Sequence, residues 1–238
     1  ERIEVLRGPQ GTLYGKNAVG GALRVITRAP SDTFESMVEF TPVGDHNRVE
    51  AKAMVNVPLN DTWAMRIAGS SVNHDGFNYS VASGRHVDDA DSQNVRAKLR
   101  FRPNDAVDGV VTANYSRQRT YGNTRKPMPA GNFAHLGGAN ISPDPRVVQP
   151  DVDGWLDRDI ASLALNLDWD TSIGKLTSVT AYREVEVDWY QALGALPVPP
   201  FVLQTDNLWR ETDEQFTQEF RLAGASFGGR LDWVAGIF

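Results

Sequence analysis

Apolar and polar residues alternate with a period of two along most of this chain. In the segment 94–102, every odd position is apolar and every even position from 96 onward is Lys or Arg. The segments 49–57 and 161–169 repeat the alternation. Successive side chains of a β-strand point to opposite faces, so this period predicts strands with one apolar and one polar face.

Nine such strands are expected. They cover residues 35–41, 48–57, 63–74, 93–102, 109–118, 159–169, 175–189, 213–223 and 230–238. The gaps at 58–62, 102–108, 170–174 and 224–229 are short, those at 75–92, 119–158 and 190–212 are long, and the first, 42–47, is a short exception. Outer-membrane barrels have short turns on one side and long loops on the other. A soluble sandwich alternates as well but has no reason to sort its loops by length, so the gaps favour a transmembrane antiparallel barrel.

Aromatic residues gather near the expected strand ends, where amphipathic rings suit a membrane interface. They are Trp63, Tyr115, Trp155, Trp169, Trp189, Tyr190, Trp209 and Trp233. The alternative for each of them is an aromatic residue of a soluble core.

Composition excludes several classes of function. The 238 residues carry a net charge of −6, contain no cysteine, and form no basic patch suited to nucleic acid. The four histidines have no metal-ligand spacing, and no nucleophile elbow or phosphate-binding glycine loop is present. Residues 88–91 are acidic but lack the glycine and the final glutamate of a calcium loop. We therefore expect neither a catalytic centre nor a metal site nor a cofactor.

The first thirty residues read as a short strand, a Gly/Pro turn and a second strand. They contain Arg7-Gly8-Pro9, Leu13-Tyr14-Gly15, and Gly20-Gly21 running into Ile26-Thr27-Arg28. In order and spacing, these motifs closely resemble the end of the plug domain of TonB-dependent outer-membrane receptors.

The resemblance implies an all-β fold in two parts. Residues 1–32 would be the C-terminal end of a plug domain, and residues 33–238 the N-terminal part of a β-barrel domain, with about nine of the twenty-two strands of the family's barrels. We expect the chain to be a piece of a longer protein in the outer membrane of a Gram-negative bacterium, with the long loops on the extracellular side.

The function implied by the resemblance is the energy-coupled import of a scarce solute through rearrangement of the plug. A ferric siderophore is the cargo that best fits the family, although relatives also import haem, cobalamin and sugars. The expected partners are TonB, which would bind a segment upstream of this chain, the lipid of the outer membrane, and the nutrient ligand. The alternative is a soluble or surface-exposed extracellular β-sandwich or adhesin-type module that binds carbohydrate or protein.

The resemblance also suggests the residues through which the plug contacts the barrel. They are Arg7, Gly8, Tyr14, Gly15, Gly20, Gly21 and Arg28. In related receptors the arginine that matches Arg7 forms charged contacts with the inner barrel wall, and such an arginine needs carboxylate partners because an unpaired buried charge is costly.

Ligand recognition is expected in the long loops 119–158 and 190–212. Their aromatic and cationic side chains could stack on and pair with an anionic aromatic chelate. The candidates are Tyr121, Arg125, Phe133, Trp155, Phe201 and Trp209.

Charged residues on the polar faces of the strands are expected to line a wet interior. They are Lys52, Arg66, Arg96, Lys98, Arg100, Arg102, Asp168, Asp170, Glu184, Glu186 and Asp188. Arg183 does not fit this pattern, because it shares a face with Val179, Ala181, Val185 and Val187. Arginine in the middle of a lipid-facing surface is costly, so either Arg183 lies outside the hydrocarbon band or the assignment of faces slips there.

Overall fold

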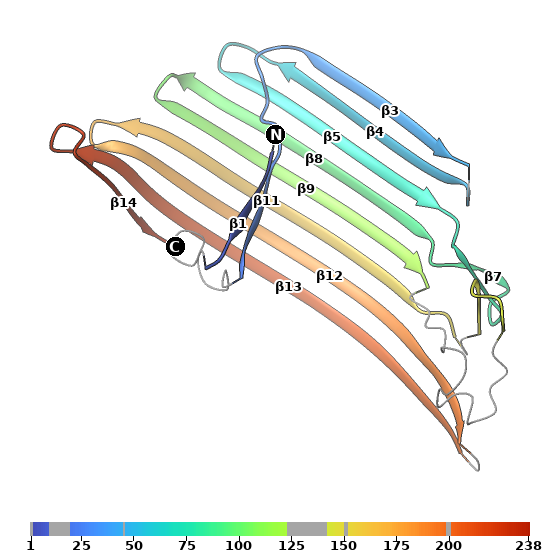
Figure 1. The fold of residues 1–238 in the computed structure, drawn as a ribbon. Helices are drawn as coiled ribbons and strands as arrows, with labels where there is room; N and C mark the ends of the chain where they lie inside the picture. The colour runs from blue at the N-terminus through green and yellow to red at the C-terminus, as the bar shows by residue number, and fades with distance from the viewer. Residues whose placement is uncertain (1, 10–19, 45, 123–141, 150–151, 199–200) are drawn as a thin grey trace.

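A computed structural model describes residues 2–9, 20–44, 46–122, 142–149, 152–198 and 201–238 of the chain. An N-terminal hairpin, β1 (Arg2–Arg7) and β2 (Gly21–Ile26), is followed by one large antiparallel sheet and one small sheet. Figure 1 shows the large sheet as a curved wall, with the hairpin crossing in front of it.

The large sheet has nine strands, which follow each other in space almost as they do in sequence. They are β3 (Glu35–Val43), β4 (Arg48–Pro58), β5 (Trp63–His74), β8 (Ala90–Asn104), β9 (Val107–Tyr121), β11 (Trp155–Thr171), β12 (Gly174–Val198), β13 (Phe201–Ser226) and β14 (Leu231–Ile237). The nine strands expected from the sequence are confirmed. They form a single sheet, which is not the architecture of the sandwich alternative.

Two of the strands extend about ten residues beyond one of their expected ends. β12 and β13 have 25 and 26 residues, and only residues 199–200 separate them. The expectation of a long loop at 190–212 is therefore wrong. The glycine and prolines of this segment are typical of a loop. Cross-strand pairing nevertheless continues through one irregularity at Ala192/Ala195, passes Pro197 and ends with Val198 opposite Phe201.

A small three-stranded sheet lies at the end of the wall where the long connections emerge (Figure 1). It consists of β10 (Val147–Val148), β6 (Asn78–Ser80) and β7 (Arg85–Val87), in that order. β10 pairs with β6 in parallel, so two connections that are far apart in sequence join here. We call the region around this sheet the crest.

The strand register gives the large sheet two distinct faces. We call the face that contacts residues 27–35 the inner face; it carries Arg66 opposite Lys98. The outer face carries Trp63 opposite Phe101, and Leu165 opposite Val111. Most of the expected interior charges do lie on the inner face, namely Lys52, Arg66, Arg96, Lys98, Arg100, Asp168 and Asp170.

Apolar side chains on the outer face are largely uncovered. Val38 is 84% exposed, Leu163 54% and Phe216 68%. Among the described residues, the buried apolar side chains are limited to Pro30, Ala64, Val87 and Val148. The sheet therefore does not enclose a hydrophobic core of its own in the part of the chain that the structure describes. Within the same residues, no helix is long and apolar enough to span a membrane.

The faces of β12 are the reverse of those expected. Arg183 lies opposite Ser162 on the inner face, together with Val179, Ala181, Val185 and Val187. The expectation that Glu184, Glu186 and Asp188 line the interior is wrong, because they lie on the outer face; Glu184 is opposite Ala161. The pairing of Thr171 with Gly174 leaves a two-residue turn that fixes the register, and register assigns the faces whatever their hydropathy. Of the two explanations offered for Arg183, the slip of faces is confirmed.

Candidate functional site

Residues 27–35 run along the inner face and are held there by Asn56. The Asn56 side chain is fully buried. Its Oδ1 accepts a hydrogen bond from the Ser31 amide at 3.0 Å, and its Nδ2 donates to the carbonyl oxygens of Ser31 at 2.9 Å and Thr33 at 2.7 Å. A third bond joins Nδ2 to Ser31 Oγ at 3.0 Å. The Asn56 carboxamide thus acts both as an acceptor for a backbone amide and as a donor to backbone carbonyl oxygens of this segment.

Three cations of β8 bind the same segment. Lys98 Nζ donates to the carbonyl oxygens of residues 27 and 28 at 2.9 and 3.1 Å. Arg100 donates to the carbonyl oxygen of Pro30 at 3.4 Å and is held by two hydrogen bonds to Asp108, at 2.9 and 2.6 Å. Arg102 pairs with Asp32 at 2.9 Å. Alternate residues of one strand therefore contact successive parts of the segment.

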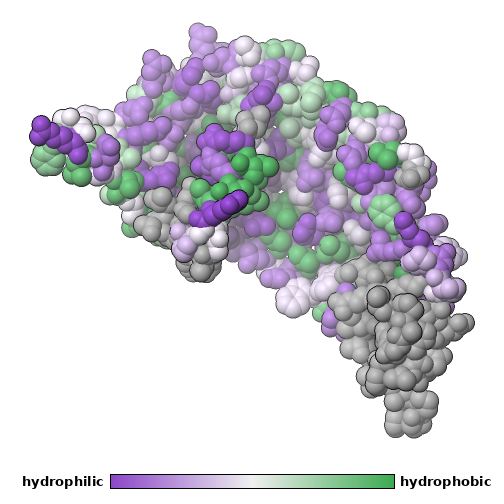
Figure 2. Space-filling view, in the orientation of Figure 1, coloured by the Kyte–Doolittle hydropathy of each residue, from purple (hydrophilic) through white to green (hydrophobic). Residues whose placement is uncertain are grey.

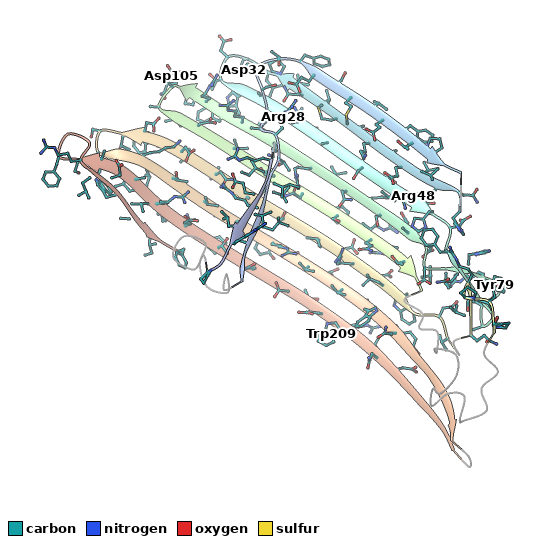
Figure 3. All side chains as sticks on the ribbon, viewed as in Figure 1. Arg28, Asp32, Arg48, Tyr79, Asp105 and Trp209 are labelled. Carbon is teal, nitrogen blue, oxygen red and sulfur yellow. The ribbon has the colours of Figure 1, made fainter. Side chains whose placement is uncertain are left out.

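Glu35, at the start of β3, completes this cluster. Its Oε2 lies 3.1 Å from Arg66 and 3.2 Å from Arg28, and its Oε1 accepts a hydrogen bond from Ser31 Oγ at 3.2 Å. The Arg66 side chain is only 11% exposed. Figure 3 shows Arg28 and Asp32 where the N-terminal segment meets the wall. We call residues 27–35 the anchor segment.

The hairpin before the anchor segment presents a bare apolar face. Ile3 pairs with Val25 and Val5 with Leu23, and all four side chains are between 62% and 68% exposed. Figure 2 shows a hydrophobic patch over the hairpin at the front of the molecule. At its polar side, a hydrogen bond from Arg2 is the largest cause of the lowered pKa of Glu4.

The residues expected to join plug and barrel lie in different surroundings. Arg28 contacts the sheet through Glu35, and Arg7 pairs with Gly21 at the end of the hairpin. Gly21 has a φ of +138°, and a Cβ there would clash with the Leu6 carbonyl oxygen, so the hairpin itself requires this glycine. Gly8 (φ +82°) and Gly20 have open space around them. Tyr14 and Gly15 lie outside the described residues.

Two of the expected ligand-recognition residues are neighbours on the outer face next to the crest. Tyr121 pairs with Trp155, and Trp155 pairs with Tyr190. The Trp155 and Tyr190 rings are stacked, with centroids 4.5 Å apart and planes at 20°. The guanidinium of Arg85 lies 4.1 Å from the centroid of the Tyr121 ring. Aromatic faces and a cation are thus combined within one small region.

Further aromatic side chains of the crest were not singled out from the sequence. His46 and His74 contact Phe77, with ring centroids 4.9 and 4.6 Å away. His86 contacts Tyr79 at 5.7 Å. His74 Nδ1 donates to the carbonyl oxygen of residue 75 at 2.9 Å. Tyr79 is labelled within this group in Figure 3.

Two acidic groups, the buried Asp153 and the half-buried Asp89, hold the crest together. Ser80 Oγ donates to Asp153 at 2.5 Å although 73 residues separate the two, and Asp153 lies 3.8 Å from Arg85. Asp89 accepts a hydrogen bond from the Tyr121 amide at 2.5 Å. Burial raises the pKa of Asp89, although the hydrogen bond from Tyr121 opposes this shift.

Of the other ligand candidates, Trp209 does not join Tyr121 and Trp155. Trp209 lies on the inner face, opposite Trp189, and donates to Glu211 at 2.8 Å. Arg125 and Phe133 lie outside the described residues. Phe201 begins β13, and its side chain is also outside what the structure describes.

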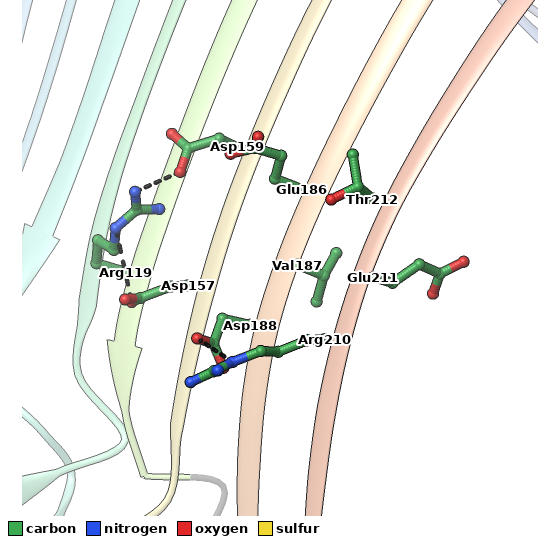
Figure 4. Close-up of a pocket in the computed structure, with 9 residues that line it drawn as sticks. All are labelled: Arg119, Asp157, Asp159, Glu186, Val187, Asp188, Arg210, Glu211 and Thr212. Atoms are coloured by element: carbon green, nitrogen blue, oxygen red, sulfur yellow. Dashed lines mark hydrogen bonds and ion pairs between the residues drawn. The ribbon is translucent and has the colours of Figure 1, made fainter.

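A charged groove of about 370 Å³ lies on the outer face, between its apolar part and the crest (Figure 4). Arg119 pairs with Asp159 and, at 3.6 Å, with Asp157, while Arg210 pairs with Asp188 at 3.1 Å. Across the described residues, no cluster of three or more His, Asp or Glu side chains is placed to hold a metal.

No family model matches this chain. Among curated proteins, it is 30% identical to the iron-regulated outer membrane virulence protein of Vibrio cholerae over 131 residues, which is 53% of this chain and 20% of that protein. It is 33% identical to the ferric enterobactin receptor PirA of Pseudomonas aeruginosa over 107 residues, 43% of this chain and 14% of that protein. The chain thus spans a fifth or less of the length of these relatives.

Solved structures match nearly the whole chain. The ferric yersiniabactin uptake receptor FyuA from Yersinia pestis has a TM-score of 0.74 at 21% identity, covering 98% of this chain and 34% of that one. The ferric-catecholate import receptor Fiu from E. coli K12 has a TM-score of 0.77 at 15% identity, covering 95% of this chain and 34% of that one. These likenesses show the fold, which is part of an outer-membrane receptor barrel.

The two kinds of likeness agree on one class of protein, the receptor barrels of the Gram-negative outer membrane, which are not enzymes. The chain is similar in sequence to parts of TonB-dependent siderophore receptors and shares the fold of part of their barrel.

Proposed function

We propose that this chain is the end of the plug, residues 1–32, and the first nine barrel strands, residues 33–238, of a receptor that imports a scarce solute across the outer membrane. TonB supplies the energy through a segment outside this chain, and the plug rearranges to let the solute pass. The observation that carries the proposal is the contrast between the two faces on the strands other than β12: an exposed apolar outer face, and a polar inner face to which the N-terminal segment is tied.

The outer face has the dimensions of a membrane-contacting band. On β11 its apolar stretch runs from Ala161 to Trp169, nine residues. At about 3.3 Å per residue and a tilt of about 40°, this stretch crosses roughly 23 Å, close to the ~25 Å apolar band of barrel proteins. Trp63 and Trp169 border it at one end, and Tyr115 and Tyr182 at the other. Such aromatic borders suit the two lipid interfaces.

The crest supports binding of an anionic, partly aromatic solute. The stacked pair Trp155–Tyr190 and the pair Arg85–Tyr121 offer flat rings and a cation that is 49% exposed. A ferric siderophore of the catecholate kind has the matching chemistry, and several relatives are named for ferric siderophores. Arg125, Phe133, Phe201 and Trp209 remain proposed contacts.

Growth on single iron sources tests this function. A strain without the full-length receptor is grown with one ferric siderophore at a time as the iron source, and is complemented with the natural receptor or with Trp155→Ala. We expect the deletion to abolish growth on one source and Trp155→Ala to raise the concentration needed by roughly tenfold, as for the loss of one aromatic contact. Trp63→Phe, at the far end of the wall, is the matched control and should complement fully. Unchanged growth of the deletion strain on every siderophore would overturn the iron cargo.

A further inference from the structure

The anchor segment and the hairpin are attached to the wall in very different ways. Between residues 27 and 35, the structure shows contacts with β3, β4, β5 and β8, through Glu35, Asn56, Arg66, Lys98 and Arg100. In the hairpin, the described hydrogen bonds of Arg2 and Arg24 go to Glu4, within the hairpin itself. Its apolar face remains uncovered by the described residues.

The contacts of the anchor segment are also of the kind that resists displacement. Asn56 is fully buried, and Pro30 is among the most deeply buried residues. Lifting the segment would break the four hydrogen bonds between Asn56 and residues 31 and 33, and would separate Arg66 from Glu35. Buried polar groups that lose their partners are costly, so the segment is expected to move only with the wall.

We propose that residues 27–35 stay bound to the inner face throughout a transport cycle, with Asn56 as the positioning residue that holds them. Movement driven by TonB is then confined to residues before Thr27, and the anchor segment is the fixed end against which the hairpin is pulled. This inference rests on the proposed function, since it assumes a receptor whose N-terminal domain is pulled.

A buried cysteine can report whether the segment lifts. Ala64 is only 3% exposed, and its register neighbour Arg100 donates to the carbonyl oxygen of Pro30. These 238 residues contain no cysteine, so in this part of the receptor Ala64→Cys is a single thiol. The full-length receptor carrying Ala64→Cys is exposed to a maleimide in cells that are importing solute, and again after a proton ionophore has removed the energy supply. Denatured receptor gives the reference for complete labelling.

We expect Ala64→Cys to be protected equally in both states. Adding Asn56→Leu should raise its labelling during import by roughly fivefold for each hydrogen bond whose loss frees the segment. Asn114→Leu is the matched control, because Asn114 also lies on the inner face but bonds to Arg96 and Ser162 rather than to the anchor segment. It should leave the labelling unchanged.

Uptake kinetics separate a positioning role from a merely structural one. Asn56→Leu should lower the maximal rate of import several-fold while the dissociation constant of the solute at the cell surface and the amount of receptor in the membrane stay as they were. Labelling of Ala64→Cys during energised import, with Asn56 intact, would overturn the inference and leave the proposed function standing. Import that is independent of TonB would instead overturn the proposed function and the inference with it.

Discussion

The two faces of the nine-stranded sheet obey different rules. On the inner face, the described contacts of Asn56, Arg66 and Arg100 satisfy polar groups of the chain's own anchor segment. On the outer face, side chains such as Val38 and Phe216 are left uncovered. The same backbone therefore serves one face that is stabilised by specific polar contacts and one that needs only an apolar surrounding. A charged substitution on the outer face should therefore destabilise the folded receptor more than the same substitution on the inner face, when the outer face is surrounded by lipid.

The largest effect is expected from a charge placed in the middle of the outer face. Leu165→Arg puts a guanidinium among Val111 and Thr180, and should destabilise the folded receptor by about 2–4 kcal/mol. Asn166→Arg, one residue along on the inner face, should cost well under this. The free energy of unfolding in urea, measured on full-length receptor in lipid bilayers, checks both. Equal costs would show that the faces do not differ in their surroundings.

A smaller effect is expected on the inner face, and it should depend on burial. Arg66→Met removes a partner of Glu35 from a site where the arginine is 11% exposed, and should cost about 1–3 kcal/mol in the same assay. Arg102→Met breaks the ion pair with Asp32. The Arg102 side chain is 41% exposed and that of Asp32 is 65% exposed, so the loss should lower the free energy of unfolding by about 0–1 kcal/mol. If Arg102→Met proves the more damaging, the anchor segment is held by its exposed end instead.

The smallest effect concerns pH at the crest, beyond both faces. The folded pKa of Asp89 is raised, so the folded crest binds this proton more tightly than the unfolded chain does. Its contribution to stability is therefore complete below the ordinary value of 3.8 and is lost as the pH rises through the folded pKa. Asp89→Asn should remove this loss, so the variant gains stability over the natural receptor on going from pH 4 to pH 7. If Asp89→Asn instead loses stability relative to the natural receptor between pH 4 and pH 7, the raised pKa of Asp89 is contradicted.

Most of the fold could be predicted from the sequence because alternation reports strands directly. The first three strands of the sheet were predicted to within two residues of their ends. The faces of β12 were not, because apolar residues were assumed to face outward, whereas the turn between Thr171 and Gly174 fixes the register independently of hydropathy. The end of the β12–β13 hairpin was missed because its prolines resemble a loop.

The candidate site was less predictable, since most of it depends on contacts between distant residues. Lys98 and Arg100 were expected on the inner face, but nothing local marks their partners 70 residues or more before them. Asn56 sits at one polar position of an alternating strand and resembles its neighbours in sequence. The role of the Asn56 amide depends on the segment that covers it, which the local sequence does not reveal. The same is true of the hydrogen bond between Ser80 and Asp153 in the crest.

A spin-label scan of β11 and β12 in the full-length receptor, reconstituted in lipid bilayers, tests the central claim most directly. Labels are placed one at a time at residues 161–169 and 176–183, and their collision rates with oxygen and with a water-soluble nickel complex are compared. The two faces predict lipid exposure at the odd positions of β11 and the even positions of β12, with the opposite positions wetter. Lipid exposure at the odd positions of both strands, or no alternation in either, would contradict the assignment of the faces.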